Sequence, residues 1–269
     1  MAGLPQKMLL VGCGNMGGAM LAGWLRGGMA GENFTVVDPY VDAVPDGVRL
    51  LRTVPDETFD VVLLAIKPQG LIDAVPTIEP VMGPQTVLLS LLAGVELATL
   101  AARFPRAGAV VRVMPNLSAA LGKSPVALAG DGVSAERVAM VDALMMPLGQ
   151  GEWIGEDRFD LVTALAGSGP AFVYRFIDAL GAAATDLGLP EDQARRLAIA
   201  TVDGATALAL ASEHAPAELA RRVASPGGVT EAGLRTLDAD DRLLKLVTDT
   251  LRDAAERSAE MSAEARKKD

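Results

Sequence analysis

Residues 7–28, KMLLVGCGNMGGAMLAGWLRGG, contain the stretch that decides the fold. Residues 8–11 form a short apolar run that is typical of a buried strand. Glycines then follow with the spacing G-x-G-x-x-G, and apolar residues recur at helical spacing until two further glycines at positions 27 and 28. This pattern predicts a strand, a tight glycine turn and a helix.

The glycine turn has the layout that a dinucleotide requires. Gly12 permits the turn out of the strand, Gly14 lets a pyrophosphate approach the backbone, and Gly17 lets the helix pack close to the strand. The start of the helix adds free N–H groups and partial positive charge. A second apolar run, residues 34–37, ends at Asp38, where the fingerprint places an acid for the ribose hydroxyls. This context favours a bound dinucleotide over a glycine-rich turn without a ligand.

The composition limits the class of protein and its partners. The 269 residues suffice for one large domain or two of ordinary size. Half of them are apolar but only 4% are aromatic, which suits closely packed helices and a parallel sheet. The formal net charge of −10 disfavours nucleic acid and anionic membrane surfaces as partners, because both repel an acidic protein.

Cysteine and histidine are too scarce for several kinds of site. Cys13 is the single cysteine, so no internal disulfide is expected, and we interpret it as a small side chain within the glycine turn. The single histidine, His214, lies at a predicted helix end and is interpreted as a surface residue. We therefore expect neither a metal site nor a Ser-His-Asp triad. A signal pattern and an apolar run of membrane-spanning length are both missing, which predicts a cytoplasmic protein.

Strand-like apolar runs alternate with helical patterns up to about residue 155. This alternation predicts an α/β fold with a Rossmann-type, doubly wound parallel sheet. In such sheets ligands bind beyond the carboxyl ends of the strands. Asp38, Lys67 and Asn116 each follow a predicted strand, so we expect them at this edge, with Lys67 beside the cofactor phosphates.

The chain from residue 156 onward has helical patterns only. We therefore predict a dinucleotide-binding Rossmann domain over residues 1–155 and a helical domain over residues 156–269. The helix expected at 170–187 is apolar on most of its faces and must be buried on several sides. The hypothesis that follows is a dimer formed through the C-terminal helices.

Residues 225–230, SPGGVT, are the second informative stretch. Two adjacent glycines expose backbone N–H groups at a predicted helix start, and Ser225 and Thr230 place a hydroxyl on either side. Such a loop suits a small anion, a carboxylate for example. An ordinary turn between two helices remains an equal alternative on spacing alone.

Five segments together resemble the pyrroline-5-carboxylate reductase family across nearly the whole chain. They are, in order, VGCGNMGGAM at 11–20, AIKPQ at 65–69, VRVMPN at 111–116, ALAGSGPAF at 164–172 and SPGGVT at 225–230. The resemblance implies a Rossmann domain joined to an all-α dimerisation domain, in dimers that often assemble further. It also implies NAD(P)H-dependent reduction of 1-pyrroline-5-carboxylate to L-proline, the last step of proline biosynthesis, by hydride transfer to a C=N bond.

The resemblance also assigns roles to individual residues. The cofactor-binding residues it implies are Gly12, Cys13, Gly14, Asn15, Met16, Gly17, Asp38, Ala65, Ile66, Lys67, Pro68, Leu92, Ala93, Gly94 and Asn116. The substrate-binding residues it implies are Ser168, Ser225, Gly227, Gly228, Val229 and Thr230. Thr230 is similar to the family's hydroxyl nearest the ring nitrogen, which makes it the expected catalytic residue.

Four positions depart from the family's usual pattern. Leu117 and Ser118 stand where Thr-Pro usually follows the MPN motif, and Val229 stands where a threonine is common. Asp38 stands where many relatives have hydroxyl and basic residues suited to a 2′-phosphate. A carboxylate there favours NADH, since it accepts from the ribose diol and repels a phosphate. Arg52 would offset this preference if it folds over the adenosine.

Rival functions of two classes, other reductases and a binding protein, are compatible with parts of the sequence. A β-hydroxyacid dehydrogenase, or another NAD(P)-dependent imine reductase, would share the glycine turn. The first of these, by resemblance, needs a lysine on the long helix after the domain junction, and no lysine lies between Lys123 and Lys245. A nucleotide-binding protein without turnover is the other rival, and the altered MPN loop leaves it open.

Overall fold

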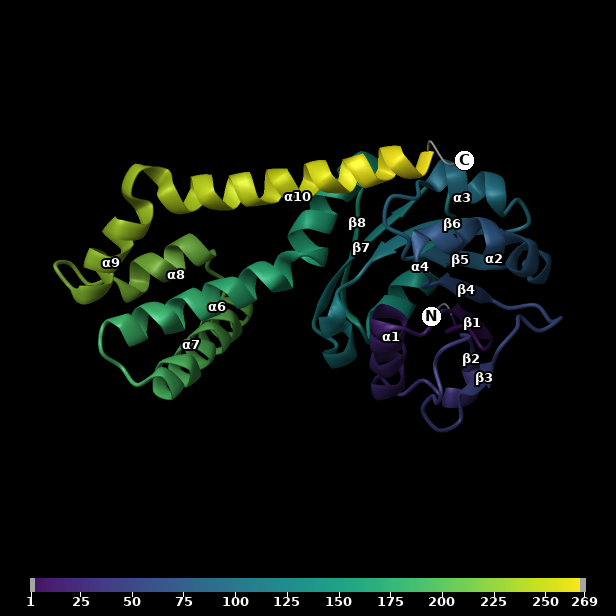
Figure 1. Ribbon diagram of the computed structural model, residues 1–269, viewed down its shortest axis with the longest axis horizontal. Helices are drawn as coiled ribbons and strands as arrows, with labels where there is room; N and C mark the ends of the chain where they lie inside the picture. The colour runs from purple at the N-terminus through teal and green to yellow at the C-terminus, as the bar shows by residue number, and fades with distance from the viewer. Residues whose placement is uncertain (1–2, 267–269) are drawn as a thin grey trace. The chain divides into compact units, whose positions relative to one another are not determined.

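The computed structural model describes residues 3–266 and divides them into two compact units (Figure 1). The N-terminal unit contains the described residues up to Ser168 together with those from Asp253 onward. The helical unit is Gly169–Arg252. The domain boundary expected after residue 155 stays a prediction, and each unit is described by itself.

An eight-stranded sheet forms the centre of the N-terminal unit, in the order β3-β2-β1-β4-β5-β6-β7-β8 (Figure 1). Its strands are β1 Met8–Val11, β2 Phe34–Val37, β3 Arg49–Leu51, β4 Val61–Leu64, β5 Val87–Ser90, β6 Ala109–Met114, β7 Ser124–Gly130 and β8 Gly149–Trp153. Strands β1, β2, β4 and β5 are buried along their whole length, as expected where helices cover both faces of a sheet. The predicted Rossmann-type α/β class is confirmed.

One strand pair corrects the expectation of a wholly parallel sheet. Strands β1 to β6 are parallel, but β7 runs antiparallel to β6, with Arg112 opposite Ala129. Only residues 115–123 connect the two strands, and a parallel crossover needs a dozen residues or more. Strand β8 then pairs parallel with β7, so the last two strands both run against the other six.

Helices cover the two faces of the sheet and form one apolar cluster on each. Helices α1 Asn15–Arg26 and α4 Ala135–Met145 pack on one face, where Trp24 stacks on Phe34 with ring centroids 5.6 Å apart. Helices α2 Leu71–Ile78 and α3 Leu97–Arg103 pack on the other face. Alternate strand residues point to opposite faces, so strands β1 to β6 each contribute side chains to both clusters.

The helical unit contains α6 Gly169–Asp186, α7 Glu191–Ala211, α8 Pro216–Val223, α9 Val229–Asp238 and the first part of α10 Arg242–Arg266 (Figure 1). Many of its large apolar side chains are exposed, among them Tyr174, Leu187, Leu208, Leu210 and Leu244. The helical unit therefore exposes apolar side chains that other residues of the same copy do not cover. Over the described residues, no helix has both the length and the apolar character needed to cross a membrane.

The last part of α10 belongs to the N-terminal unit. Ser258 donates from its hydroxyl to the Asp160 carboxylate at 2.6 Å. Gly94, which follows β5, lies against the α10 backbone, and a Cβ on it would come within 3.2 Å of the Met261 carbonyl oxygen. Gly94 also has a φ of +77°, so this position needs a glycine for two independent reasons.

Candidate functional site

The turn between β1 and α1 leaves no room for side chains at two of its glycines. A Cβ on Gly12 would lie 2.7 Å from the Ala65 carbonyl oxygen, and the φ of +94° is in the region that favours glycine. A Cβ on Gly17 would lie 2.5 Å from the Gly12 carbonyl oxygen and 3.2 Å from the Ala65 Cβ. Helix α1 therefore approaches the ends of β1 and β4 at backbone contact distance.

The start of α1 is open, in contrast to the closely packed glycines around it. Gly14 is the N-cap residue, has no side chain to bond the first amides, and has no atom within 4 Å of a Cβ position. Gly14 and Asn15 are exposed, whereas Met16 is half-buried. The first amides of a helix have no partner within the helix, so they remain available to an anion. This cradle fits the pyrophosphate of a dinucleotide.

Asp38 links the end of β2 to this turn. Its Oδ2 accepts from the Cys13 amide at 2.8 Å, and its Oδ1 accepts from the amides of Tyr40 at 2.8 Å and Val41 at 3.1 Å. Burial, the largest single influence, raises the pKa of Asp38, but the three hydrogen bonds and the Arg52 charge together lower it. Asp38 is 7% exposed and ionised at neutral pH.

Arg52 holds the loop that follows Asp38. Its Nη1 donates to the carbonyl oxygens of Asp38 and Val41, each at 2.7 Å. The Arg52 guanidinium thus lies at the end of β2, next to Asp38. It binds backbone carbonyls there and not the Asp38 carboxylate. Cys13, on the other side of Asp38, has its thiol pKa raised by burial first and by the Asp38 charge second. At neutral pH it is a thiol, as expected of a small side chain within the turn.

The ends of β4 and β5 bring two further predicted segments to the same edge. The Ala65 amide donates to the Val11 carbonyl at 2.8 Å, which joins this strand end to β1. Ile66 packs against the apolar cluster on the face of the sheet that α2 and α3 cover. Lys67 is exposed and Pro68 begins a short 3-10 helix, Pro68–Gly70. The next segment, 92–94, is more enclosed, with Leu92 2% exposed, Ala93 half-buried and Gly94 under α10. A ligand would meet its backbone rather than its side chains.

Asn116 is directed into the protein and bonds three partners. Its Nδ2 donates to the Ala166 carbonyl at 2.9 Å, and its Oδ1 accepts from the Ser118 amide at 2.9 Å and the Ser118 hydroxyl at 2.5 Å. The Asn116 amide donates to Ser124 Oγ at 2.9 Å. Ser118, a departure from the family's proline, supplies an N–H that proline lacks. The sequence therefore missed Ser118 and Ser124 as partners of Asn116.

The carbonyl that Asn116 binds belongs to a π-helix, Thr163–Gly167. π-Helical segments are rare in proteins, and those that occur often lie at functional sites. The Ser168 amide donates to the Thr163 carbonyl at 3.0 Å, which closes the segment, and the Ser168 side chain is half-buried. The apolar spacing over residues 157–166 is typical of an ordinary helix, because a single π-turn does not alter the pattern enough to be seen.

The loop 225–230 lies in the helical unit and starts with a β-turn. The Gly228 amide donates to the Ser225 carbonyl at 2.9 Å, and Gly227 has a φ of +71°. Helix α9 then begins, with Gly228 as an N-cap residue that offers no side chain to the first amides. Thr230 is half-buried and its hydroxyl has no hydrogen bond within the described part of the chain. The predicted substrate residues 225–230 thus form one loop, whereas Ser168 is in the N-terminal unit.

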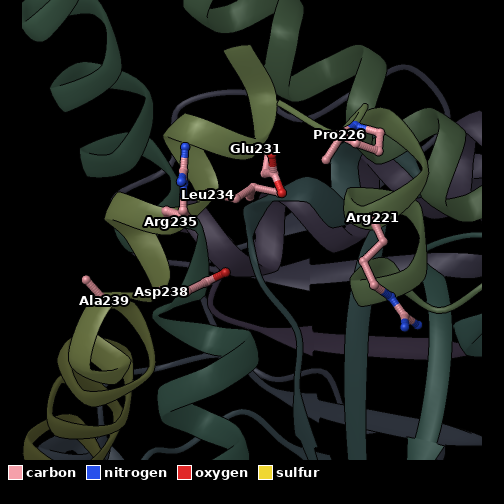
Figure 2. Close-up of a pocket in the computed structure, with 8 residues that line it drawn as sticks. Arg221, Pro226, Glu231, Leu234, Arg235, Asp238 and Ala239 are labelled. Atoms are coloured by element: carbon pink, nitrogen blue, oxygen red, sulfur yellow. The ribbon is translucent and has the colours of Figure 1, made fainter. Parts of the chain in front are cut away.

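Glu231 is a residue of this loop region that sequence reasoning missed. Its Oε2 accepts from the Gly227 amide at 2.6 Å. Figure 2 shows Glu231 beside Leu234 and Pro226 in a groove of about 480 Å³ between α8 and α9. The signal that could have found it is a glutamate three residues after the N-cap Gly228, the position from which an acid reaches back to the start of a helix.

No group of three or more His, Cys, Asp or Glu residues able to hold a metal ion occurs over residues 3–266. His214 is exposed, and its backbone amide donates to Ser212 Oγ at 3.0 Å.

Comparisons with known proteins reach the same family from three directions. The family model for pyrroline-5-carboxylate reductase dimerisation matches residues 156–261. Pyrroline-5-carboxylate reductase 2 of Bacillus subtilis is 36% identical over 275 aligned positions, which cover 95% of both chains. The pyrroline-5-carboxylate reductase of Pseudomonas aeruginosa is 32% identical, over 95% of this chain and 97% of its own.

Solved structures with the same fold cover almost the whole chain. A pyrroline-5-carboxylate reductase from Coxiella burnetii has a TM-score of 0.89 at 27% identity, over 96% of this chain and 98% of its own. The NADP-bound pyrroline carboxylate reductase of Plasmodium falciparum has a TM-score of 0.83 at 24% identity, over 97% of this chain and 99% of its own. The second likeness concerns the fold alone.

Proposed function

The chain belongs to the pyrroline-5-carboxylate reductase family, and we propose on this basis that it reduces 1-pyrroline-5-carboxylate to L-proline with a nicotinamide dinucleotide, the last step of proline biosynthesis. The observation that carries the proposal is the relationship over 95% of the chain at 36% identity. It is an oxidoreductase acting on a C=N bond.

The residues around the glycine turn fit the dinucleotide. Gly12 and Gly17 have no space for a Cβ, while Gly14 leaves the start of α1 open to an anion. We assign the pyrophosphate to this turn and to Lys67, the adenosine ribose to Asp38, and further coenzyme contacts to the strand ends at 65–68, 92–94 and 116. When bound, the reduced nicotinamide supplies the hydride that the imine carbon accepts.

The protein's part in the reaction is to hold the substrate and its ring nitrogen. The backbone amides at the start of α9 and the hydroxyls of Ser225 and Thr230 suit the substrate carboxylate. Thr230 is assigned a hydrogen bond to the ring nitrogen, because its hydroxyl has no other partner in the described chain. A protonated imine is already electrophilic, so no strong general acid is required. Ser168 and the turn around it are assigned to the wall of the substrate pocket.

The coenzyme preference proposed here is for NADH at least as much as NADPH. Asp38 is ionised, and a carboxylate beside the ribose accepts from the diol and repels a 2′-phosphate. Arg52 would act in the opposite direction, although its Nη1 binds the Asp38 and Val41 carbonyls. A kcat/KM for NADPH about 100-fold above that for NADH, or roughly 2.7 kcal/mol, would contradict this preference.

Self-association through the C-terminal helices is part of the proposed function. The matched family model describes dimerisation and spans residues 156–261. Large apolar side chains of the helical unit, such as Leu187 and Leu210, are 89% and 83% exposed. Surface of this kind is buried against a second copy in obligate assemblies. A monomeric mass by light scattering at micromolar concentration would contradict it.

A spectrophotometric assay tests the activity directly. With pyrroline-5-carboxylate and NADH, the reductase oxidises the coenzyme and forms L-proline in equal amounts. A β-hydroxyacid dehydrogenase would instead act on hydroxyacids with NAD⁺, and a silent binding protein would bind the coenzyme without turnover. Coenzyme binding without oxidation in the presence of pyrroline-5-carboxylate and NADPH or NADH would overturn the proposed function.

A further inference from the structure

Residues 225–228 adopt a turn with a fixed geometry. Pro226 is its second residue, and Gly227 is its third, with a φ of +71°. The Gly228 amide donates to the Ser225 carbonyl at 2.9 Å across the turn. This combination of proline, a positive φ at glycine and an i to i+3 hydrogen bond defines a type II turn. In that geometry the amide of Gly227 is not used by the turn itself.

Glu231 uses this amide. The Gly227 N–H donates to Glu231 Oε2 at 2.6 Å, across the start of α9. Two of the loop's amides, Gly227 and Gly228, are thus satisfied by the chain itself. Val229 and Thr230 occupy the first two positions of α9, and their amides have no hydrogen bond to another described residue. These two amides, like that of Glu231, belong to the first turn of α9 and are available to an anionic ligand.

The Glu231 carboxylate has no competing partner in the described residues of the chain. Arg221, which lines the same groove, is ion-paired with Glu218, and among the described residues no ion pair joins Arg235 to Glu231. No described basic side chain therefore draws the Glu231 carboxylate away from the Gly227 amide. The positive end of the α9 dipole also stabilises the negative charge of this carboxylate. A charge-assisted bond of this length is stronger than a neutral one.

We propose that Glu231 is a positioning residue for the substrate carboxylate. It holds Gly227 in its left-handed conformation, and it thereby directs the Val229 and Thr230 amides and the Thr230 hydroxyl at the site where the substrate binds. The proposal rests on the proposed function, because it needs the loop to be the substrate loop. It also means that the loop divides its amides between two carboxylates, and that Gly227 acts on the substrate through conformation rather than contact.

Steady-state kinetics of Glu231 variants test this role. Glu231→Ala removes the acceptor, so the KM for pyrroline-5-carboxylate should rise at least 10-fold while the coenzyme KM stays within threefold. Glu231→Gln keeps an acceptor oxygen at the same reach and should return the substrate KM to within threefold of the unaltered enzyme. Glu231→Asp keeps the charge but is one methylene shorter, so it should behave like the alanine variant.

Asp238→Ala is the matched control, since it removes a carboxylate from the same helix and the same groove without touching the loop. It should leave the substrate KM unchanged. A substrate KM that is unchanged or lower in Glu231→Ala would overturn the proposal, because a carboxylate that only caps the helix, or that competes with the substrate, predicts that result. If the alanine variant does not fold, the substrate KM values of Glu231→Asp and Glu231→Gln are compared instead. Equal values in these two variants would overturn the proposal. An unaltered enzyme that fails to reduce pyrroline-5-carboxylate contradicts the proposed function instead.

Discussion

The Asp38 carboxylate accepts a hydrogen bond from the Cys13 backbone amide at 2.8 Å, and this bond ties the end of β2 to the glycine turn after β1. The same carboxylate also holds its own loop through the amides of Tyr40 and Val41. One side chain therefore sets the relative position of the two segments assigned to the pyrophosphate and the ribose. Changes at Asp38 should affect both the coenzyme and the fold.

Asp38→Asn should shift the coenzyme preference toward NADPH. Asparagine has one acceptor oxygen, so it cannot serve the amides of Cys13 and Tyr40 together, and it no longer repels a 2′-phosphate. We expect kcat/KM for NADH to fall at least 10-fold, or about 1.4 kcal/mol, with a smaller change for NADPH. Asp42→Asn, in the same loop and exposed, is the control. An unchanged ratio of the two kcat/KM values would separate Asp38 from coenzyme choice.

The lowered pKa of Asp38 predicts how acid affects the stability of the protein. Its pKa is lower in the folded protein than in the unfolded chain, where it is about 3.9. The stabilisation is therefore complete above about pH 4 and is lost as the pH falls through the folded-state pKa. The difference in unfolding free energy between the unaltered protein and Asp38→Asn should be constant from pH 5 to about 7 and shrink below about pH 4. Chemical denaturation across this range measures it, and a difference that grows in acid would contradict the assignment.

Thr230→Ala should lower kcat/KM for pyrroline-5-carboxylate at least 10-fold, or about 1.4 kcal/mol. The reason is the loss of the hydroxyl assigned to the ring nitrogen. Thr230→Ser keeps the hydroxyl and should retain most of the activity, which makes it the control. Steady-state assays at saturating coenzyme measure both variants. Equal kcat/KM for the alanine variant and the unaltered enzyme would remove Thr230 from the mechanism.

Asn116→Asp should destabilise the protein although the two side chains have nearly the same shape. It places a carboxylate oxygen where Nδ2 now donates to the Ala166 carbonyl at 2.9 Å, in a site that is 5% exposed. A buried acceptor facing an acceptor costs about 1–3 kcal/mol, and more if it is charged. Ser118→Ala, which removes one of two bonds to Asn116 Oδ1, should cost about 1 kcal/mol. Urea denaturation of both variants decides, and equal stability of Asn116→Asp and the unaltered protein would contradict this role of Asn116.

Gly17→Ala should weaken coenzyme binding, whereas Gly18→Ala, at the next position of α1, should stabilise the helix. A Cβ at Gly17 lies 2.5 Å from the Gly12 carbonyl oxygen, so the glycine turn must move and coenzyme affinity should fall at least 10-fold. The nearest atom to a Cβ at Gly18 is the Cys13 carbonyl oxygen at 3.6 Å, an ordinary contact. Alanine there should stabilise the helix by about 0.5–1 kcal/mol. Calorimetric titration with NADH and thermal unfolding measure both effects, and similar coenzyme affinity in the two variants would contradict the close approach at Gly17.

The sequence was informative wherever one local pattern was sufficient. The glycine spacing after residues 8–11 predicted the turn whose contacts at Gly12 and Gly17 the structure describes. A serine directly before a helix is a typical cap, and the Ser134 Oγ accepts from the Arg137 amide at 3.4 Å at the start of α4. Strand alternation predicted the sheet and the edge where Asp38 lies. The spacing of the glycines, the residue before a helix and the apolar pattern of each strand are local features, so they can be read from the order of the chain.

Other features depend on segments that meet only in the folded chain. The antiparallel direction of β7, the π-helix at Thr163–Gly167 and the contact of Gly94 with α10 have no local signature. The hydrogen bond from the Asn116 side-chain Nδ2 to the Ala166 carbonyl, 50 residues away, is another contact of this kind, while the coenzyme contact assigned to Asn116 stays a prediction.

The sequence by itself therefore determined the class of fold, the glycine turn and the two loops that carry the proposed chemistry. Only the tertiary structure decided which amides of those loops are already occupied, by Asp38 at Cys13 and by Glu231 at Gly227. The physical reason is that a hydrogen-bond partner is selected by distance and direction in space. Residue type and spacing give the capacity of a group to bond, whereas the packing of the chain decides which partner comes within reach.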